Sequence, residues 1–283
     1  MDRLPALIAV LASLLGAGCF LDDDDGSGPT PGADSGTPGF DAGPGFDAGG
    51  TTIPAEIARY IRGDLAARLV IEVDYVEDRE PGAPVNGDLT ALLAGILDKP
   101  GGIDVVLDAT IASRGADHAW SETEVRALAA ETRTFAETSE TAAMHALFID
   151  GHSDLDGDGR VILGVAYDYV NHVIFRDTIE SACASAAIGP LFRDELCAAA
   201  LLNVWTHEIG HILGLVARGL PMQEDHQDEA HGAHDDDPDC VMYYTAETGQ
   251  LLDTLAGRLT GGGSAAPTFD AACLADIAAV RDL

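Results

Sequence analysis

The sequence predicts a mixed α+β fold: a five-strand, mostly parallel twisted sheet, one long helix and a smaller C-terminal subdomain. Three observations predict it. Strand-like and helix-like segments alternate over residues 69–149, which is typical of a parallel sheet with crossover helices. Two strand-like segments then follow within residues 161–174. A long helical pattern over residues 191–215 comes next, and regular periodicity is largely lost beyond residue 219.

The predicted strands are short apolar segments. Residues 69–75 alternate apolar side chains with acidic or aromatic ones, as in a strand with one buried face. The other strands are expected at residues 103–111, at residues 143–149, and on both sides of a break at residues 168–171.

The predicted helices rest on capping residues and spacing. We expect one over residues 88–97, capped near Asn86 or Asp88, and another from Ser121 to about Phe135, where Ser121 and Glu124 fit a capping box. Shorter helices are expected at residues 251–259 and 270–283. The helix at 191–215 has apolar residues at near-helical spacing: Leu196, Ala200, Leu201, Val204, Trp205, Ile209, Ile212 and Leu213.

Residues 1–18 have the features of an export signal. Arg3 precedes an apolar run at residues 7–15, which is too short to span a bilayer. The small residues before Cys19 resemble a bacterial lipobox. This resemblance implies acylation at Cys19 and a lipid-anchored place in the cell envelope, periplasmic or facing outward. An ordinary signal peptide with an incidental cysteine is the alternative.

Residues 19–52 are predicted to be an acidic, disordered tether. They are rich in Asp, Gly, Pro, Ser and Thr, and Gly-Phe-Asp-Ala-Gly occurs twice, at residues 39–43 and 45–49. Such a segment buries too little apolar surface to offset the entropy lost on ordering. Residues 53–283 are therefore expected to form one folded domain.

The chain is strongly acidic, with 48 Asp and Glu against 15 Lys and Arg and a formal charge of −33. Most of these acids lie beyond the tether. This charge argues against nucleic acid as a partner and is compatible with cationic substrates, divalent ions or a salty habitat. We expect a monomer whose only membrane contact is the lipid at Cys19.

Four cysteines remain after Cys19. In an exported protein an even number favours disulfides. Proximity in the sequence favours the pairs Cys183–Cys197 and Cys240–Cys273, and free thiols are the alternative.

The sequence His207-Glu208-Ile209-Gly210-His211 indicates a metal site. Two imidazoles four residues apart lie on one face of a helix and can bind one ion, for which zinc is well suited. Neutral ligands leave the charge of the ion undiminished, so that it acidifies a bound water. Glu208 is the carboxylate expected to activate that metal-bound water.

The residues that follow resemble the metzincins, a family of zinc peptidases. Gly214 comes three residues after His211. Further along the chain Met242 follows a later His, as does the Met in the family's turn beneath the metal. Ala217 stands where the family has its third His. The interval to Met242 usual in matrixins and archaemetzincins points instead to His234, with His226 and His231 as alternatives. Asp235 replaces a Cys of archaemetzincins, which puts their second, cysteine-bound zinc in doubt.

This resemblance implies a zinc-dependent endopeptidase with a metzincin-like fold and a protein or peptide as substrate. Residues 163–167 would be the edge strand on which an extended peptide binds by strand addition. Tyr244 occupies a position that in astacins and serralysins carries a tyrosine able to stabilise the oxyanion. Tyr243, or ordinary packing of both rings, is the alternative.

Calcium is a second candidate cofactor. Residues 224–239 contain eight acids and no Lys or Arg, which fits either a calcium site or a solvated loop. Asp154 to Gly159 has the oxygen spacing of a calcium loop but lacks the Glu of an EF-hand, so a hairpin turn is preferred.

Two other functions stay open at the level of sequence. In the first, Glu224 or Glu229 is the third zinc ligand, as in gluzincins. In the second, the chain is a catalytically inactive, zinc-binding surface lipoprotein with a peptidase fold.

Overall fold

The computed structural model describes residues 52–157 and 161–283, which belong to one unit of the chain. The predicted signal peptide, Cys19 and nearly all of the predicted tether lie outside the described residues, as do Asp158 and Gly159 of the candidate calcium loop. No helix in the described ranges has the length and apolar character needed to cross a bilayer.

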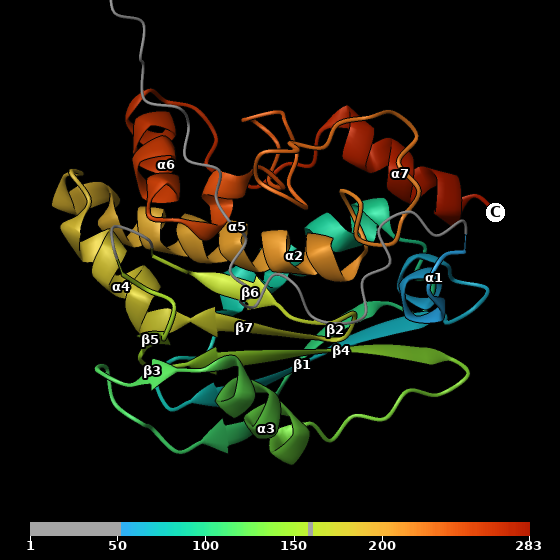
Figure 1. The fold of residues 1–283 in the computed structure, drawn as a ribbon, viewed down its shortest axis with the longest axis horizontal. Helices are drawn as coiled ribbons and strands as arrows, with labels where there is room; N and C mark the ends of the chain where they lie inside the picture. The colour runs from blue at the N-terminus through green and yellow to red at the C-terminus, as the bar shows by residue number, and fades with distance from the viewer. Residues whose placement is uncertain (1–51, 158–160) are drawn as a thin grey trace, which may run out of the picture. The chain divides into compact units, whose positions relative to one another are not determined.

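A five-strand sheet forms the centre of the fold (Figure 1). Strand β1 (Arg68–Val76) pairs in parallel with β2 (Ile103–Ile111) on one side and with β4 (Thr141–Ile149) on the other. Strand β7 (Asn171–Phe175) is parallel to β4, and the edge strand β6 (Gly164–Ala166) is antiparallel to β7. The predicted five-strand, mostly parallel sheet is confirmed. Strands β3 (Ala119–Trp120) and β5 (His152–Ser153) form a separate parallel pair.

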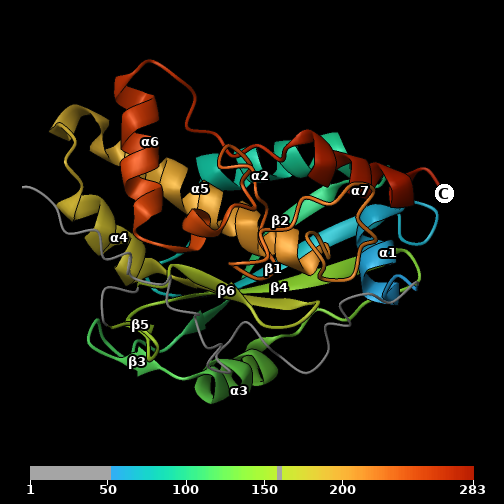
Figure 2. The ribbon, with the colours of Figure 1, turned by 45° about the horizontal axis from the view of Figure 1, so that its top comes forward.

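Helices cover both faces of this sheet (Figures 1 and 2). Helix α3 (Glu122–Thr132) lies on one face. The other face packs against α1 (Ala55–Ile61), α2 (Ala83–Ile96) and the long helix α5 (Arg193–Ile212). Side chains of β1 alternate accordingly, with Leu69, Ile71 and Val73 fully buried on the α5 side. Burial on both faces explains why the parallel strands are so apolar.

The C-terminal part packs on the side of α5 away from the sheet. Helix α6 (Gln250–Thr260) contacts α5, and α7 (Ala271–Arg281) reaches α1 and α2. Helix α4 (Arg176–Ser185) precedes α5 in the chain and contacts both α5 and β4. A long irregular segment between α5 and α6 ends in a short 3-10 helix, η3 (Tyr244–Glu247), which also contacts α5. This arrangement brings residues beyond 219 onto the C-terminal half of α5.

Several predicted boundaries are corrected by the structure. Helix α2 begins at Ala83 rather than near residue 88, because Pro84 sits in the first turn, where its missing N–H has no helical partner to lose. Helix α3 has the predicted capping box at Ser121 but ends at Thr132. A 3-10 turn at Pro190–Phe192 delays the start of α5 to Arg193. Helices α1 and α4 and the two-residue strands had not been predicted. Helix α1 and these strands are too short to show periodicity.

The segment after β5 is described only in part, because residues 158–160 lie outside the described residues. Strand β5 pairs in parallel with β3, and the hairpin turn expected at residues 154–159 stays a prediction. Asp156 accepts a hydrogen bond from the amide of Ile162, which closes this loop locally.

Candidate metal centre

Helix α5 holds His207 and His211 one turn apart on a buried face. Every residue from Ala200 to Ile212 is buried, and the two histidines are 0% and 1% exposed. Their Nε2 atoms are 3.0 Å apart. The four-residue spacing therefore places both imidazoles on one face of α5, as expected, and both rings face the same small volume.

Met242 lies directly beneath these two residues. A Cβ atom on Gly210 would come within 2.2 Å of Met242 Sδ, so only glycine allows the segment at Met242 to pack this closely against α5. The carbonyl of Val241 accepts a 2.6 Å hydrogen bond from His207 Nδ1. Fixing Nδ1 in this way orients the ring and turns Nε2 toward the site.

His234 is the third histidine of the site. Its ring centroid lies 5.3 Å from that of His207 and 5.2 Å from that of His211. His234 Nδ1 donates a 2.6 Å hydrogen bond to the carbonyl of His231, which again directs Nε2 inward. The adjacent amide of Asp235 donates to the carbonyl of Met242 at 3.0 Å and holds this part of the irregular segment beside the turn.

The two alternative histidines lie elsewhere. His226 lies between Asp235 and Asp276. The ring of His231 stacks on that of Tyr244, with centroids 3.6 Å apart. Of the three candidates, the structure brings only His234 to the pair on α5.

Glu247 completes the cluster and was missed by the sequence analysis. Its Oε1 atom lies 3.2 Å from Nε2 of His207, 3.2 Å from Nε2 of His211 and 3.3 Å from Nε2 of His234. We call these four residues the histidine cluster. No sequence signal pointed to Glu247, because it lies five residues after Met242 in a stretch without periodicity.

The chemistry of the cluster fits a metal ion. His207 and His234 use their Nδ1 hydrogens on backbone carbonyls, so in the neutral tautomer their Nε2 atoms are electron-pair donors. The ligand atoms of these two residues, of His211 and of Glu247 all lie within 4.8 Å of one another. Such a convergence of donors is stabilised by a cation, and imidazole nitrogen with carboxylate oxygen is a set that zinc accepts.

Burial and charge tune two of these groups. Burial, with smaller contributions from Arg218 and His207, holds the pKa of His211 well below its ordinary value and keeps the ring neutral. Burial by itself would raise the pKa of Glu247, but His234 and the hydrogen-bonding rings of His207 and His211 lower it well below the usual range. The directions of these two shifts favour a neutral His211 and an ionised Glu247, which are the forms in which each group binds a metal.

Comparisons with known proteins add little to this geometry. No family model matches the sequence, and no curated protein matches it. Among solved structures, the fold is similar to an archaemetzincin from Methanopyrus kandleri, with a TM-score of 0.45 and 15% identity over 76% of this chain and 96% of that one. At this level of similarity the function has to be argued from the side chains of this chain.

Glu208 lies between α5 and the edge strand. It is fully buried, and a Cβ atom on Gly164 would come within 2.9 Å of its Oε1 atom. Strand β6 therefore passes directly over this carboxylate. Tyr244 is half-buried, with its ring on His231 and 4.6 Å from that of Tyr243.

A second cluster lies on the opposite side of the segment that carries His234. It consists of His226, Asp235, Asp270 and Cys273, and we call it the aspartate–cysteine cluster. Asp235 accepts hydrogen bonds from His226 Nδ1 at 2.8 Å and from Cys273 Sγ at 3.3 Å. The residue that replaces a family cysteine is thus paired with an imidazole and a thiol.

The four described cysteines are free thiols in the structure, so neither expected disulfide is formed. The expected partners nevertheless lie together. The sulfur atoms of Cys240 and Cys273 are 3.9 Å apart, and Cys183 contacts Cys197 through its thiol, which together with burial raises the Cys183 pKa.

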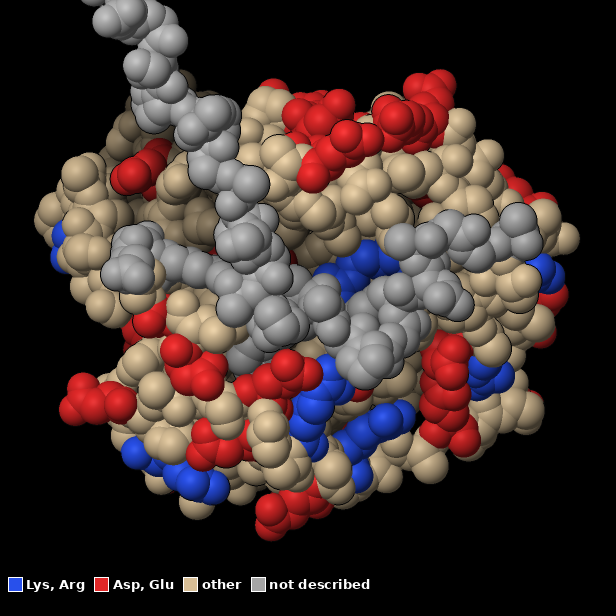
Figure 3. Space-filling model, viewed as in Figure 1, with Lys and Arg blue, Asp and Glu red and all other residues tan. Residues whose placement is uncertain are grey.

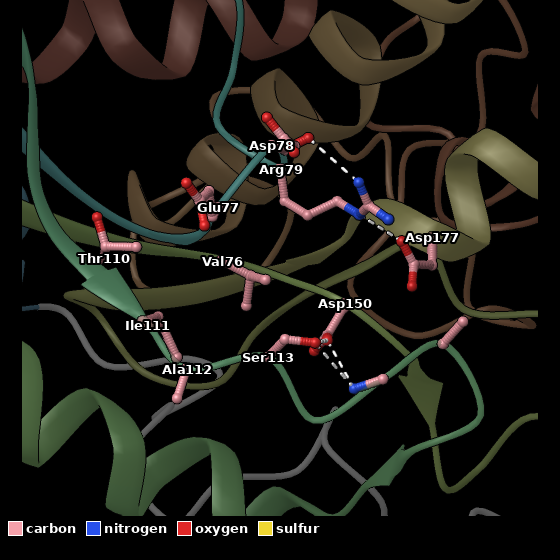
Figure 4. A pocket seen from close by; sticks show the side chains of 12 residues that line it. Val76, Glu77, Asp78, Arg79, Thr110, Ile111, Ala112, Ser113, Asp150 and Asp177 are labelled. Atoms are coloured by element: carbon pink, nitrogen blue, oxygen red, sulfur yellow. Dashed lines mark hydrogen bonds and ion pairs between the residues drawn. The ribbon is translucent and has the colours of Figure 1, made fainter.

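A cavity of about 570 Å³ lies at the carboxyl ends of β1 and β2, apart from the histidine cluster (Figure 4). Its lining contains one ion pair and a hydrogen-bonded carboxylate. Arg79 lies 2.5 Å from Asp177, and Asp150 accepts from the Ser113 hydroxyl at 2.5 Å and the Gly115 amide at 2.7 Å. The face in Figure 3 carries acidic side chains over both its upper and lower parts, in keeping with the composition.

Proposed function

We propose that this chain is a zinc-dependent endopeptidase of the metzincin kind, with His207, His211 and His234 as zinc ligands. The observation that carries the proposal is the convergence of His234 with the two histidines of α5 above Met242. Three neutral imidazoles around an open position are the ligand set of many catalytic zinc sites.

The proposed roles follow from where the side chains lie. Zinc, when bound, would polarise the scissile carbonyl and make water more acidic. Glu208 would take the proton from the attacking water and pass it to the departing amine. Its position against Gly164 supports this role, because a peptide lying along β6 would place its scissile bond near this carboxylate. Tyr244 remains the proposed oxyanion donor, and its ring would have to leave His231 to serve.

The proposed substrate is an extended peptide or protein segment. Strand β6 is the last strand of the sheet order, and one edge of it pairs with β7. A peptide could add to its other edge through main-chain hydrogen bonds. The net charge of −33 favours cationic peptides over acidic ones and disfavours nucleic acid.

The remaining parts of the proposal concern the rest of the chain. We propose export, attachment to the cell envelope through a lipid on Cys19, and a monomeric catalytic domain at the end of the tether. Calcium binding by residues 224–239 is a further proposal. The gluzincin alternative has less support, since Glu224 and Glu229 are exposed and lie outside the histidine cluster.

Zinc content and cleavage of casein or gelatin test the proposal in the full chain. Wild type should bind zinc and cleave, whereas Glu208→Gln should bind zinc with at least about 100-fold less cleavage, the lower end of what general acid–base catalysis contributes. Glu131→Gln, an exposed acid in α3 with no role in the proposed site, is the control. Full activity in Glu208→Gln would refute the mechanism, and zinc binding without cleavage by wild type would favour the inactive surface lipoprotein.

A further inference from the structure

Glu247 is a metal-capable side chain that the proposed mechanism does not use. We propose that its carboxylate is a fourth zinc ligand that closes the site, so that the enzyme is latent until the Glu247 side chain turns away. This inference rests on the proposed function, because it takes the three histidines as zinc ligands.

The distances match four ligands around one ion. The separations that involve Glu247 Oε1 are 3.2, 3.2 and 3.3 Å, and the two histidines of α5 are 3.0 Å apart at Nε2. These are four of the six separations among the four ligand atoms, and the other two are within 4.8 Å. Ligands about 2 Å from one tetrahedral zinc are a little over 3 Å apart, so the four separations that involve Glu247 and the pair on α5 have the length of such edges. Glu247 Oε1 therefore lies at a corner of the coordination sphere and not at the metal position itself.

The backbone of η3 fixes this placement. The amide of Ala246 donates to Tyr243 and the amide of Thr248 to Thr245, both at 3.0 Å. The carbonyl of Glu247 accepts from the amide of Leu163 at 3.1 Å, which ties η3 to the residue before β6. With the main chain held at this point, the carboxylate reaches the histidines by side-chain torsions alone.

The same placement allows the carboxylate to leave. The Glu247 side chain is 19% exposed, whereas those of His207 and His211 are 0% and 1% exposed. Rotation about its own torsions can carry the carboxylate to solvent without moving η3 or α5. Glu247 is therefore the member of the cluster that can exchange with another ligand.

Closure by Glu247 has two chemical consequences. Four protein ligands are typical of structural zinc sites, whereas catalytic sites keep one position open. A carboxylate also offsets part of the charge of the ion, which weakens its ability to acidify water. Hydrolysis thus requires the state in which Glu247 has turned away and Glu208 faces the open position.

Cobalt binding tests this inference without an activity assay, because Co²⁺ shows its coordination in its visible spectrum and replaces zinc on the same ligands. The full-chain wild type, Glu247→Gln, Glu247→Ala, His207→Ala and the control Glu131→Gln, an exposed acid of α3, are titrated with Co²⁺ against a chelator. Azide is then added to each complex. We expect the two Glu247 variants to bind Co²⁺ at least about 10-fold more weakly than wild type. Azide should change their spectra and leave those of wild type and Glu131→Gln unchanged.

The outcomes separate the two proposals. Suppose that wild type binds Co²⁺, that His207→Ala loses it, and that the Glu247 variants match wild type in affinity and azide response. The histidine site then stands, and the proposal that Glu247 closes it is overturned. If folded wild type binds no Co²⁺, both proposals fail. Equal azide sensitivity in wild type and Glu247→Gln also overturns the proposal that Glu247 closes the site, since it shows an open position in the presence of Glu247.

Discussion

The histidine cluster and the aspartate–cysteine cluster lie on either side of residues 234–235 and differ in which of their atoms carry protons. In the histidine cluster, His207 and His234 use their Nδ1 hydrogens on backbone carbonyls, so their inward-facing atoms are electron-pair donors. In the aspartate–cysteine cluster, His226 lies between the carboxylates of Asp235 and Asp276 at 2.8 and 3.1 Å. Each His226 nitrogen can donate to an acid there.

This difference indicates which of the two clusters a metal ion would stabilise. A set of converging electron-pair donors is stabilised by a cation, whereas an imidazolium between two carboxylates is already paired. Although burial alone would lower the pKa of His226, its hydrogen bonds and charge interactions with Asp235 and Asp276 raise it overall. Neighbouring residues of one segment thus belong to the proposed zinc site through His234 and to a self-contained cluster through Asp235.

The largest expected effect is a difference in zinc affinity between variants of the neighbouring residues His234 and Asp235. His234→Ala should weaken zinc binding by more than about 100-fold, beyond the loss typical of residues outside the ligand shell. Asp235→Asn should leave zinc affinity within about 10-fold of wild type, because Asp235 acts on the site only through the local backbone. Competition with a chelator measures both. Equal losses in the two variants would show that the clusters act as one unit.

Zinc should stabilise the protein through the histidine cluster alone. At a free concentration about 100 times the dissociation constant, an ion that binds only the folded state contributes about 2.7 kcal/mol. We expect this gain in wild type and in Cys273→Ser, and none in His207→Ala. Thermal unfolding with zinc and with a chelator measures it. A zinc-dependent gain that disappears in Cys273→Ser would place the ion in the aspartate–cysteine cluster.

Packing beneath the histidine cluster should also be sensitive to one methyl group. Gly210→Ala should cost about 1–3 kcal/mol, because its Cβ atom would lie 2.2 Å from Met242 Sδ. The matched control is Gly257→Ala in α6, where nothing lies within 4 Å and the change should stabilise by up to about 1 kcal/mol. Denaturant unfolding measures both. A neutral Gly210→Ala would mean that Met242 can move away from α5.

The smallest expected effect is a pH dependence of the aspartate–cysteine cluster. Because the pKa of His226 is raised on folding, its contribution to stability is complete below the unfolded value of about 6.5 and is lost as pH rises through the folded value. The free energy of unfolding in a chelator should therefore fall less over that range in His226→Gln than in wild type. Parallel curves for the two proteins would contradict the proposed charge state of His226.

The sequence by itself determined the features that depend on neighbouring residues. The His207–His211 pair and the strand β1 follow from helical and strand periodicity, which act over a few residues. The capping box of α3 likewise depends only on Ser121 and Glu124. These local predictions were confirmed, and so was the mostly parallel sheet that alternating strands and helices imply. The single buried face expected for β1 is corrected, since Glu72 and Asp74 on its other face are buried too.

Only the tertiary structure decided which distant residues join the pair on α5. His226, His231 and His234 lie in one irregular segment without periodicity, and the sequence interval to Met242 favoured His234 only by resemblance. Backbone hydrogen bonds from Asp235 to Met242 and from Leu163 to Glu247 place the last two members of the histidine cluster. Such contacts join segments far apart along the chain, and local side-chain pattern does not encode them.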